Sequence, residues 1–83
     1  MESPNEPQNK SQQKDAWSRE LAGGTLTFIT TGLGNPVAAY VHEAKFERGT
    51  SVYSMTRQST EDLSRAEVEL RFADFISEIR HGQ

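Results

Sequence analysis

Apolar residues repeat at three- and four-residue spacing through the last quarter of the chain, which is the period of an amphipathic helix. One stripe is Leu63, Ala66, Leu70, Ala73 and Ile76, and an adjoining stripe is Val68, Phe72, Phe75 and Ile79. Ser59 can cap the first turn, and Gly82 can follow the last one. The pattern therefore predicts one long helix from Ser59 to His81, with an apolar face wider than a single coiled-coil seam.

Three earlier segments have the pattern of β-strands, because they are rich in β-branched and aromatic residues. They are Thr25–Thr31, Val37–Glu47 and Ser51–Gln58. Turn-forming residues separate them, at positions 32–36 and at Arg48–Gly49. We expect an α+β fold in which a three-stranded antiparallel sheet packs on the one long C-terminal helix.

Strand parity divides the side chains of this sheet between two faces. If Glu47 pairs with Thr50 and Thr31 pairs with Val37, one set faces the helix as the core. That set is Leu26, Phe28, Ala38, Tyr40, His42, Ala44, Phe46, Tyr53 and Met55. The opposite face carries a second apolar group, which is Ile29, Val37, Ala39, Val41 and Val52. This is more apolar surface than a solvated sheet face usually shows, so either the Trp17 segment or another chain is expected to cover it.

The N-terminal part of the chain divides into a tail and the start of the domain. Residues 1–14 are dominated by Pro, Asn, Gln, Ser and Lys, and we expect them to be a disordered tail before a single small domain at 15–83. Asp15–Leu21 could form a short helix that ends at Gly23 and Gly24. The only tryptophan, Trp17, either tucks against its own domain or anchors a partner.

Composition narrows the class of protein. The chain has 83 residues, and a folded part of about 60 residues is marginal alone, so we expect it to associate with itself or a partner. A net charge of −3 argues against a general nucleic-acid binder. Without cysteine there is neither a disulfide framework nor a thiolate zinc site. The chain shows neither a signal-peptide pattern nor a membrane-spanning apolar run, so we expect a cytoplasmic protein.

The residue types that carry chemistry are present but badly placed for it. His42 and His81 are far apart in sequence, which is poor spacing for a metal site. Ser54, His42 and Glu43 are the residue types of a hydrolase, but neighbours on a strand point to opposite faces. The glycine loop at 32–36 lacks the ending of a phosphate-binding loop and precedes a strand. We therefore expect no catalytic residue, no metal, no cofactor and no small-molecule substrate, and hence not an enzyme.

The expected β-β-β-α order resembles two nucleic-acid-binding architectures in topology. One is the double-stranded RNA-binding domain, whose first helix would correspond to Asp15–Leu21. The other is the three-stranded-sheet-plus-helix module of some integrases and plant transcription factors. Ser59, Thr60, Glu61 and Asp62 stand where the RNA-binding family carries a basic cluster. The resemblance implies an alternative function, a small nucleic-acid-binding domain that uses Lys45, Arg48 and Arg57.

The leading hypothesis is a non-enzymatic protein-interaction module, such as an adaptor, an inhibitor or an accessory protein. We expect it to bind another protein and also itself as a homodimer, through the apolar sheet face or the helix stripe. The candidate interface residues are Trp17, Ile29, Val37, Ala39, Val41, Val52, Phe72 and Phe75.

Overall fold

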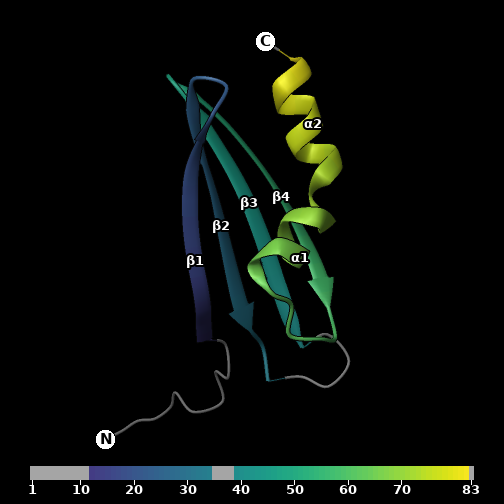
Figure 1. Cartoon of the computed structure of the whole chain (residues 1–83). Helices are drawn as coiled ribbons and strands as arrows, with labels where there is room; N and C mark the ends of the chain where they lie inside the picture. The colour runs from purple at the N-terminus through teal and green to yellow at the C-terminus, as the bar shows by residue number, and fades with distance from the viewer. Residues whose placement is uncertain (1–11, 35–38, 83) are drawn as a thin grey trace, which may run out of the picture.

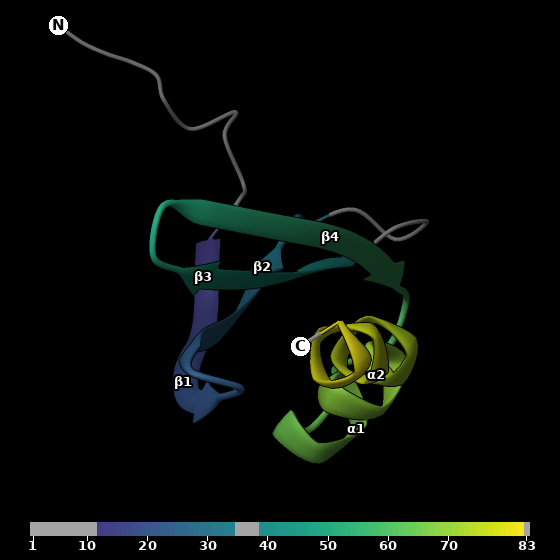
Figure 2. The same ribbon diagram turned by 90° about the horizontal axis from the view of Figure 1, so that it is seen from above.

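The computed structural model describes residues 12–34 and 39–82 of the chain. Its elements are β1 (Gln12–Leu21), β2 (Gly24–Gly32), β3 (Tyr40–Arg48), β4 (Ser51–Ser59), α1 (Arg65–Arg71) and α2 (Ala73–His81). The four strands form one antiparallel sheet in chain order, and both helices lie against the same side of it (Figures 1 and 2). The expected α+β class is confirmed. The expectation of three strands packed on one long helix is wrong, because the sheet has four strands and two short helices follow it. The β-β-β-α order, which carried the two nucleic-acid-binding resemblances, is therefore wrong as well.

The additional strand is β1, which occupies the segment expected to be a short helix. Its side chains alternate: Trp17, Arg19 and Leu21 are half-buried on the helix side, and the residues between them are exposed. A two-residue turn, Ala22–Gly23, joins β1 to β2 with φ angles of 51° and 79°. Type I′ hairpin turns need positive φ at both positions, and alanine rarely adopts it. Because alanine stands at the first turn position, the sequence lacks the usual residue pattern of a two-residue hairpin, and the β1–β2 hairpin is not predicted from it. β1 also includes Gln12–Lys14, while residues 1–11 of the expected tail lie outside the described part.

The strand registers differ from the expected ones by an even number of residues. Thr31 pairs with Val41 rather than Val37, and Glu47 pairs with Val52 rather than Thr50. An even shift leaves every side chain on its predicted face. The buried members of the expected core face are Leu26, Phe28, His42, Ala44 and Phe46. On the same face Tyr53 is 54% exposed, and Ala38 lies outside the described residues.

The helical part begins later than Ser59. β4 continues to Ser59, which pairs with Tyr40 of β3. The true N-cap is Ser64, whose hydroxyl accepts from the Glu67 backbone N–H at 3.2 Å while the Glu67 carboxylate accepts from the Ser64 backbone N–H at 2.9 Å. This capping box uses the preferred glutamate, and the Ser59-to-Asp62 spacing offers only the shorter aspartate. The better cap in the sequence is the one used.

The helical part is also interrupted, at Phe72. In a continuous helix the Phe75 N–H would donate to the Arg71 carbonyl. Instead the Phe75 N–H donates to Asp74 Oδ1 at 2.8 Å, and the Arg71 carbonyl accepts from Arg57 Nε of β4 at 2.9 Å. Arg57 also forms a two-bond ion pair with Asp74. One strand residue and one helix residue thus supply partners for the Arg71 carbonyl and the Phe75 N–H at the break.

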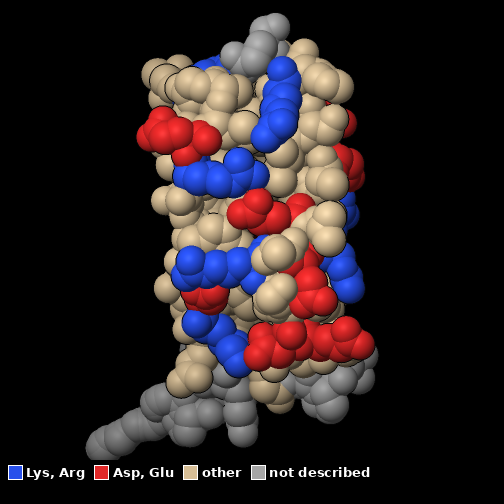
Figure 3. All heavy atoms as spheres, in the orientation of Figure 1, with Lys and Arg blue, Asp and Glu red and all other residues tan. Residues whose placement is uncertain are grey.

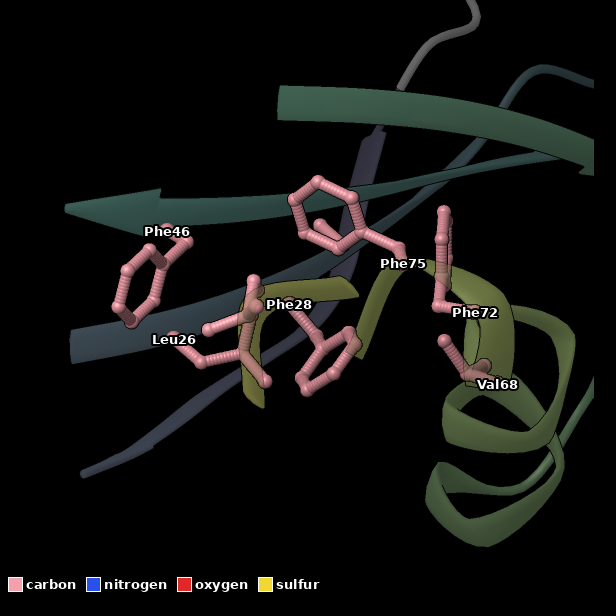
Figure 4. Close-up of a cluster of buried hydrophobic side chains, with 8 residues drawn as sticks. Leu26, Phe28, Phe46, Val68, Phe72 and Phe75 are labelled. Atoms are coloured by element: carbon pink, nitrogen blue, oxygen red, sulfur yellow. The ribbon is translucent and has the colours of Figure 1, made fainter. Parts of the chain in front are cut away.

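The core lies between the sheet and the aromatic stripe of the helices (Figure 4). Its helical members are Val68, Phe72, Phe75 and Ile79, and its sheet members are Leu26, Phe28, Ala44 and Phe46. The rings of Phe28 and Phe72 lie 6.0 Å apart, a distance typical of interacting aromatic pairs. The larger stripe is therefore inside, and the stripe of Leu70 and its small neighbours faces outward.

Candidate protein interface

An apolar strip runs along the outer side of both helices, opposite the core. We call it the Leu70 stripe, and it consists of Ala66, Leu70, Ala73 and Ser77; Ile76, which packs partly against the core, borders it. Leu70 is 73% exposed, the highest exposure among the large hydrophobic side chains of the described residues. The stripe lines a shallow hollow that crosses the junction of α1 and α2. Small residues on both sides of Leu70 would let another backbone approach closely.

The two ends of this hollow differ in charge. At the α1 end, Glu69 is already occupied, because it accepts from Trp17 Nε1 at 2.9 Å and from Arg19 Nη2 at 3.0 Å. At the α2 end lie Arg80 and His81, in the last turn, where a cation complements the helix dipole. The hollow is therefore apolar in its centre and has basic side chains at one end.

The predicted apolar cluster on the open sheet face is only partly assembled. Ile29 pairs with Glu43, and Val41 pairs with Thr31, so Ile29 and Val41 are diagonal neighbours. Val52 lies at the other end of the sheet, opposite Glu47. Threonine and serine fill most positions between them. Ala39 is half-buried just before β3, and Val37 is outside the described residues.

Three other predicted interface residues belong to the domain's own core. Phe72 and Phe75 are 0% and 6% exposed, so neither is available at the surface. Trp17 stacks on Phe28 at 5.2 Å between ring centroids, and the Arg65 guanidinium lies 5.0 Å from its ring. Trp17 therefore holds β1 to α1. The exposed helix surface belongs to Leu70. The sequence analysis distinguished the two helix stripes but took its interface candidates, Phe72 and Phe75, from the stripe with the larger side chains; side-chain size is the signal that favours that stripe as the core.

The three cations proposed for nucleic-acid binding are not brought together. Arg48 donates to the Ala22 carbonyl at 3.1 Å and lies over the Phe46 ring, on the helix side. Arg57 is engaged at the helix break, also on the helix side. Lys45 alone is on the open face, where Glu43 and Glu47 flank it on the same strand. On the helix side, basic and acidic side chains are interleaved rather than segregated (Figure 3).

His42 is buried between two hydroxyl groups. Ser59 donates its hydroxyl proton to the Glu61 carbonyl at 2.8 Å, so its oxygen accepts from His42 Nε2 at 2.9 Å. Nδ1 must then accept from the Thr30 hydroxyl, also at 2.9 Å. Burial, followed by the charge of Arg71, lowers the pKa of His42, while Asp62 acts in the opposite direction. In this arrangement the imidazole of His42 is neutral. The hydroxyl proton of Ser59 is already donated to the Glu61 carbonyl, so Ser59 has no proton to donate to the ring.

The structure does not bring together Ser54, His42 and Glu43, the three residue types of a hydrolase. His42 faces the helices, whereas Glu43 pairs with Thr56 and faces away with Ser54. Among the described residues there is also no cluster of three or more His, Asp or Glu that could hold a metal ion. A cleft of about 180 Å³ between Phe46, Tyr53 and Phe75 is below the usual range for a small-molecule site, roughly 300–1,000 Å³. The surface that the geometry favours is the Leu70 stripe.

Comparisons of the chain with protein-family models, curated proteins and solved structures find no match. In residues 12–34 and 39–82, neither helix has the length and apolar character needed to cross a membrane.

Proposed function

We propose that this chain is a non-enzymatic protein-interaction module that binds an apolar helix of another protein on the Leu70 stripe. The observation that carries the proposal is the 73% exposure of Leu70 at the centre of a stripe of alanine and serine, directly opposite a filled core. Burial of a leucine side chain is worth about 1.5–3 kcal/mol, so Leu70 can anchor a partner.

The shape of the stripe supports a helix as the occupant. The apolar positions follow helical spacing along α1 and α2, and small side chains precede and follow Leu70 along the hollow. Helices pack by fitting the side-chain ridges of one into the grooves of the other. Arg80 and His81 at one end favour a partner helix that places a carboxylate there.

The proposal can be tested with a photo-crosslinking amino acid at residue 70 and, as a matched control, at Thr27 on the open sheet face. We expect position 70 to capture a protein from cells of the source organism that position 27 does not. The captured protein, purified, then provides the defined ligand for calorimetry with the unmodified chain.

We expect Leu70→Glu to weaken that binding at least about tenfold, because a carboxylate would be buried against the apolar partner, while the melting temperature stays unchanged. Leu70→Met keeps the apolar volume and should bind nearly as well. Equal binding by Leu70→Glu and the unmodified chain would show that the stripe is not the docking surface.

A further inference from the structure

The two edge strands of the sheet differ in how they are protected. β1 and β4 are the edges, because the strand order is β1-β2-β3-β4. The pairing of β1 with β2 is broken by a register shift between Gln13 and Asp15, and β1 carries four charged residues, Lys14, Asp15, Arg19 and Glu20. Bulges and charged side chains are common protections against edge-to-edge pairing.

β4 has none of these protections. Ser51–Ser59 pairs with β3 along its whole length without a register shift and contains no proline. Its one charged residue, Arg57, points toward the helices and is held by Asp74. Val52 and Tyr53 are 57% and 54% exposed, and in the described part of the chain no strand pairs with the outer edge. Within residues 12–34 and 39–82, β4 is thus a long edge strand that pairs on one side only and carries exposed apolar side chains.

The hairpin that joins β3 to β4 determines which backbone groups point outward. Its two loop residues are Gly49 and Thr50, and Arg48 faces Ser51. In a two-residue hairpin the residues beside the loop form a hydrogen-bonded pair, and such pairs alternate along the ladder. The N–H and C=O groups directed away from β3 therefore belong to Val52, Ser54, Thr56 and Gln58.

From this edge we propose that two copies of the chain dimerise by antiparallel pairing of β4 with β4. The two four-stranded sheets then form one continuous sheet, with the two-fold axis at Met55. This inference is independent of the Leu70 stripe, which lies on the outer side of the helices, away from the sheet.

The sequence of β4 is self-complementary in this register. Centring on Met55 overlaps all of Ser51–Ser59, and it matches outward-directed residues with each other. Val52 pairs with Gln58 of the second copy and Ser54 with Thr56, each pair exchanging two backbone hydrogen bonds. Between them, Tyr53 lies beside Arg57 of the second copy, so the two Arg57 side chains do not face each other. The pairing also covers Val52 and Tyr53.

The first test is the solution mass by sedimentation equilibrium across a wide concentration range, and we expect a dimer. Ser54→Pro removes an outward N–H, leaves the β3–β4 hydrogen bonds in place and is tolerated on an edge strand, so it should give a folded monomer. Leu70→Glu is the control and should remain dimeric. A wild-type monomer at every concentration, or a dimer that Leu70→Glu disrupts and Ser54→Pro does not, would overturn the proposal.

The second test reads the register and does not depend on how well Ser54→Pro folds. The chain has no cysteine, so each variant carries a single thiol. Facing residues in an antiparallel pair have Cα atoms about 4.5–5.5 Å apart, which suits a disulfide. We expect Met55→Cys to form a covalent dimer in air, because residue 55 faces its own copy.

Val52→Cys and Gln58→Cys are the matched controls for that register. Neither should link to itself, because residues of the same number would lie about 20 Å apart. A mixture of the two variants should form a covalent dimer of one chain of each kind. Self-linking by Val52→Cys as fast as by Met55→Cys would contradict the proposed pairing.

Discussion

His42 is the one titratable side chain that is fully buried among residues 12–34 and 39–82. It is 1% exposed and its two ring nitrogens are used by Thr30 and Ser59, with Nδ1 as acceptor and Nε2 as donor. The folded state therefore prefers the neutral ring, and the pKa of His42 is lowered mainly by its burial. In the unfolded chain a histidine has a pKa near 6.5.

This difference predicts that the protein loses stability in mild acid. The unfolded state binds a proton more readily, so the contribution of His42 is complete above about pH 6.5 and falls as the pH drops below that value, by at most about 1.4 kcal/mol per pH unit. The pKa values of Asp15, Glu67 and Asp74 are lowered too, but carboxyl groups lose their contribution only nearer pH 4. Denaturant unfolding at pH 7 and pH 5 measures the effect.

His42→Gln is the control for this pH dependence, because glutamine keeps a polar group between the two hydroxyls and does not titrate. We expect its free energy of unfolding to be lower than that of the wild type at pH 7 and to change much less between pH 7 and pH 5. An equal fall in both proteins would assign the acid sensitivity to other groups.

The sequence could place His42 on the core face but could not identify its partners. Parity alone determines the face, and the even register shifts preserved it. The hydroxyl of Ser59 becomes a partner only because β4 extends to that residue, whereas helix periodicity favoured Ser59 as a cap. This network is made by residues of β2, β3 and β4 and by the linker after β4, so it depends on the strand registers, which differ from the expected ones by two and four residues.

At the scale of elements, the break at Phe72 depends on Arg57 and Asp74. The Phe75 N–H and the backbone carbonyl of Arg71 are each satisfied by one of these side chains. The Phe75 N–H and then Arg57 lower the pKa of Asp74, so the carboxylate is charged at neutral pH. Each side chain makes the other's role possible, and the two should be energetically coupled.

We therefore expect Arg57→Ala and Asp74→Ala each to lower the melting temperature and to speed hydrogen exchange at the Phe75 amide. In the double variant that amide can return to the Arg71 carbonyl as in a regular helix, so the combined loss should be smaller than the sum. Thermal melts with amide exchange by NMR measure both effects. Additive losses would mean that the break is imposed by core packing instead.

The strands and helices were unequally predictable, for a physical reason. β2, β3 and β4 show clear alternation, and their faces follow from it. In β1 the side chains on the helix side are Trp17, Arg19 and Leu21. Because one of these positions is a partly buried arginine, the apolar residues of this segment do not alternate in the sequence, and their spacing resembles that of a helix. The helix break contains neither proline nor glycine, and the side chain that satisfies its Arg71 carbonyl comes from Arg57, 14 residues earlier in the chain, so the local sequence gives no sign of the break.

At the scale of the whole molecule, β1 joins the helices through polar contacts and one aromatic residue. Lys14, Asp15 and Arg19 form ion pairs with Asp62, Arg65 and Glu69. These side chains are largely or partly exposed, and such ion pairs contribute little to stability. Trp17 adds stacking on Phe28, a hydrogen bond to Glu69 and a contact with Arg65, so most of the coupling between β1 and α1 should come from this residue.

We expect Trp17→Ala to lower the free energy of unfolding by about 3 kcal/mol, a large part of the stability of a domain this small. Trp17→Phe keeps an aromatic ring over Phe28 and loses only the bond to Glu69, so a loss of about 1 kcal/mol is expected. Guanidinium unfolding followed by far-ultraviolet circular dichroism measures both variants, with Arg19→Ala as the ion-pair control. Arg19→Ala should have a far smaller effect than Trp17→Ala. If its loss is as large, the exposed charges rather than the indole hold β1 to the helices.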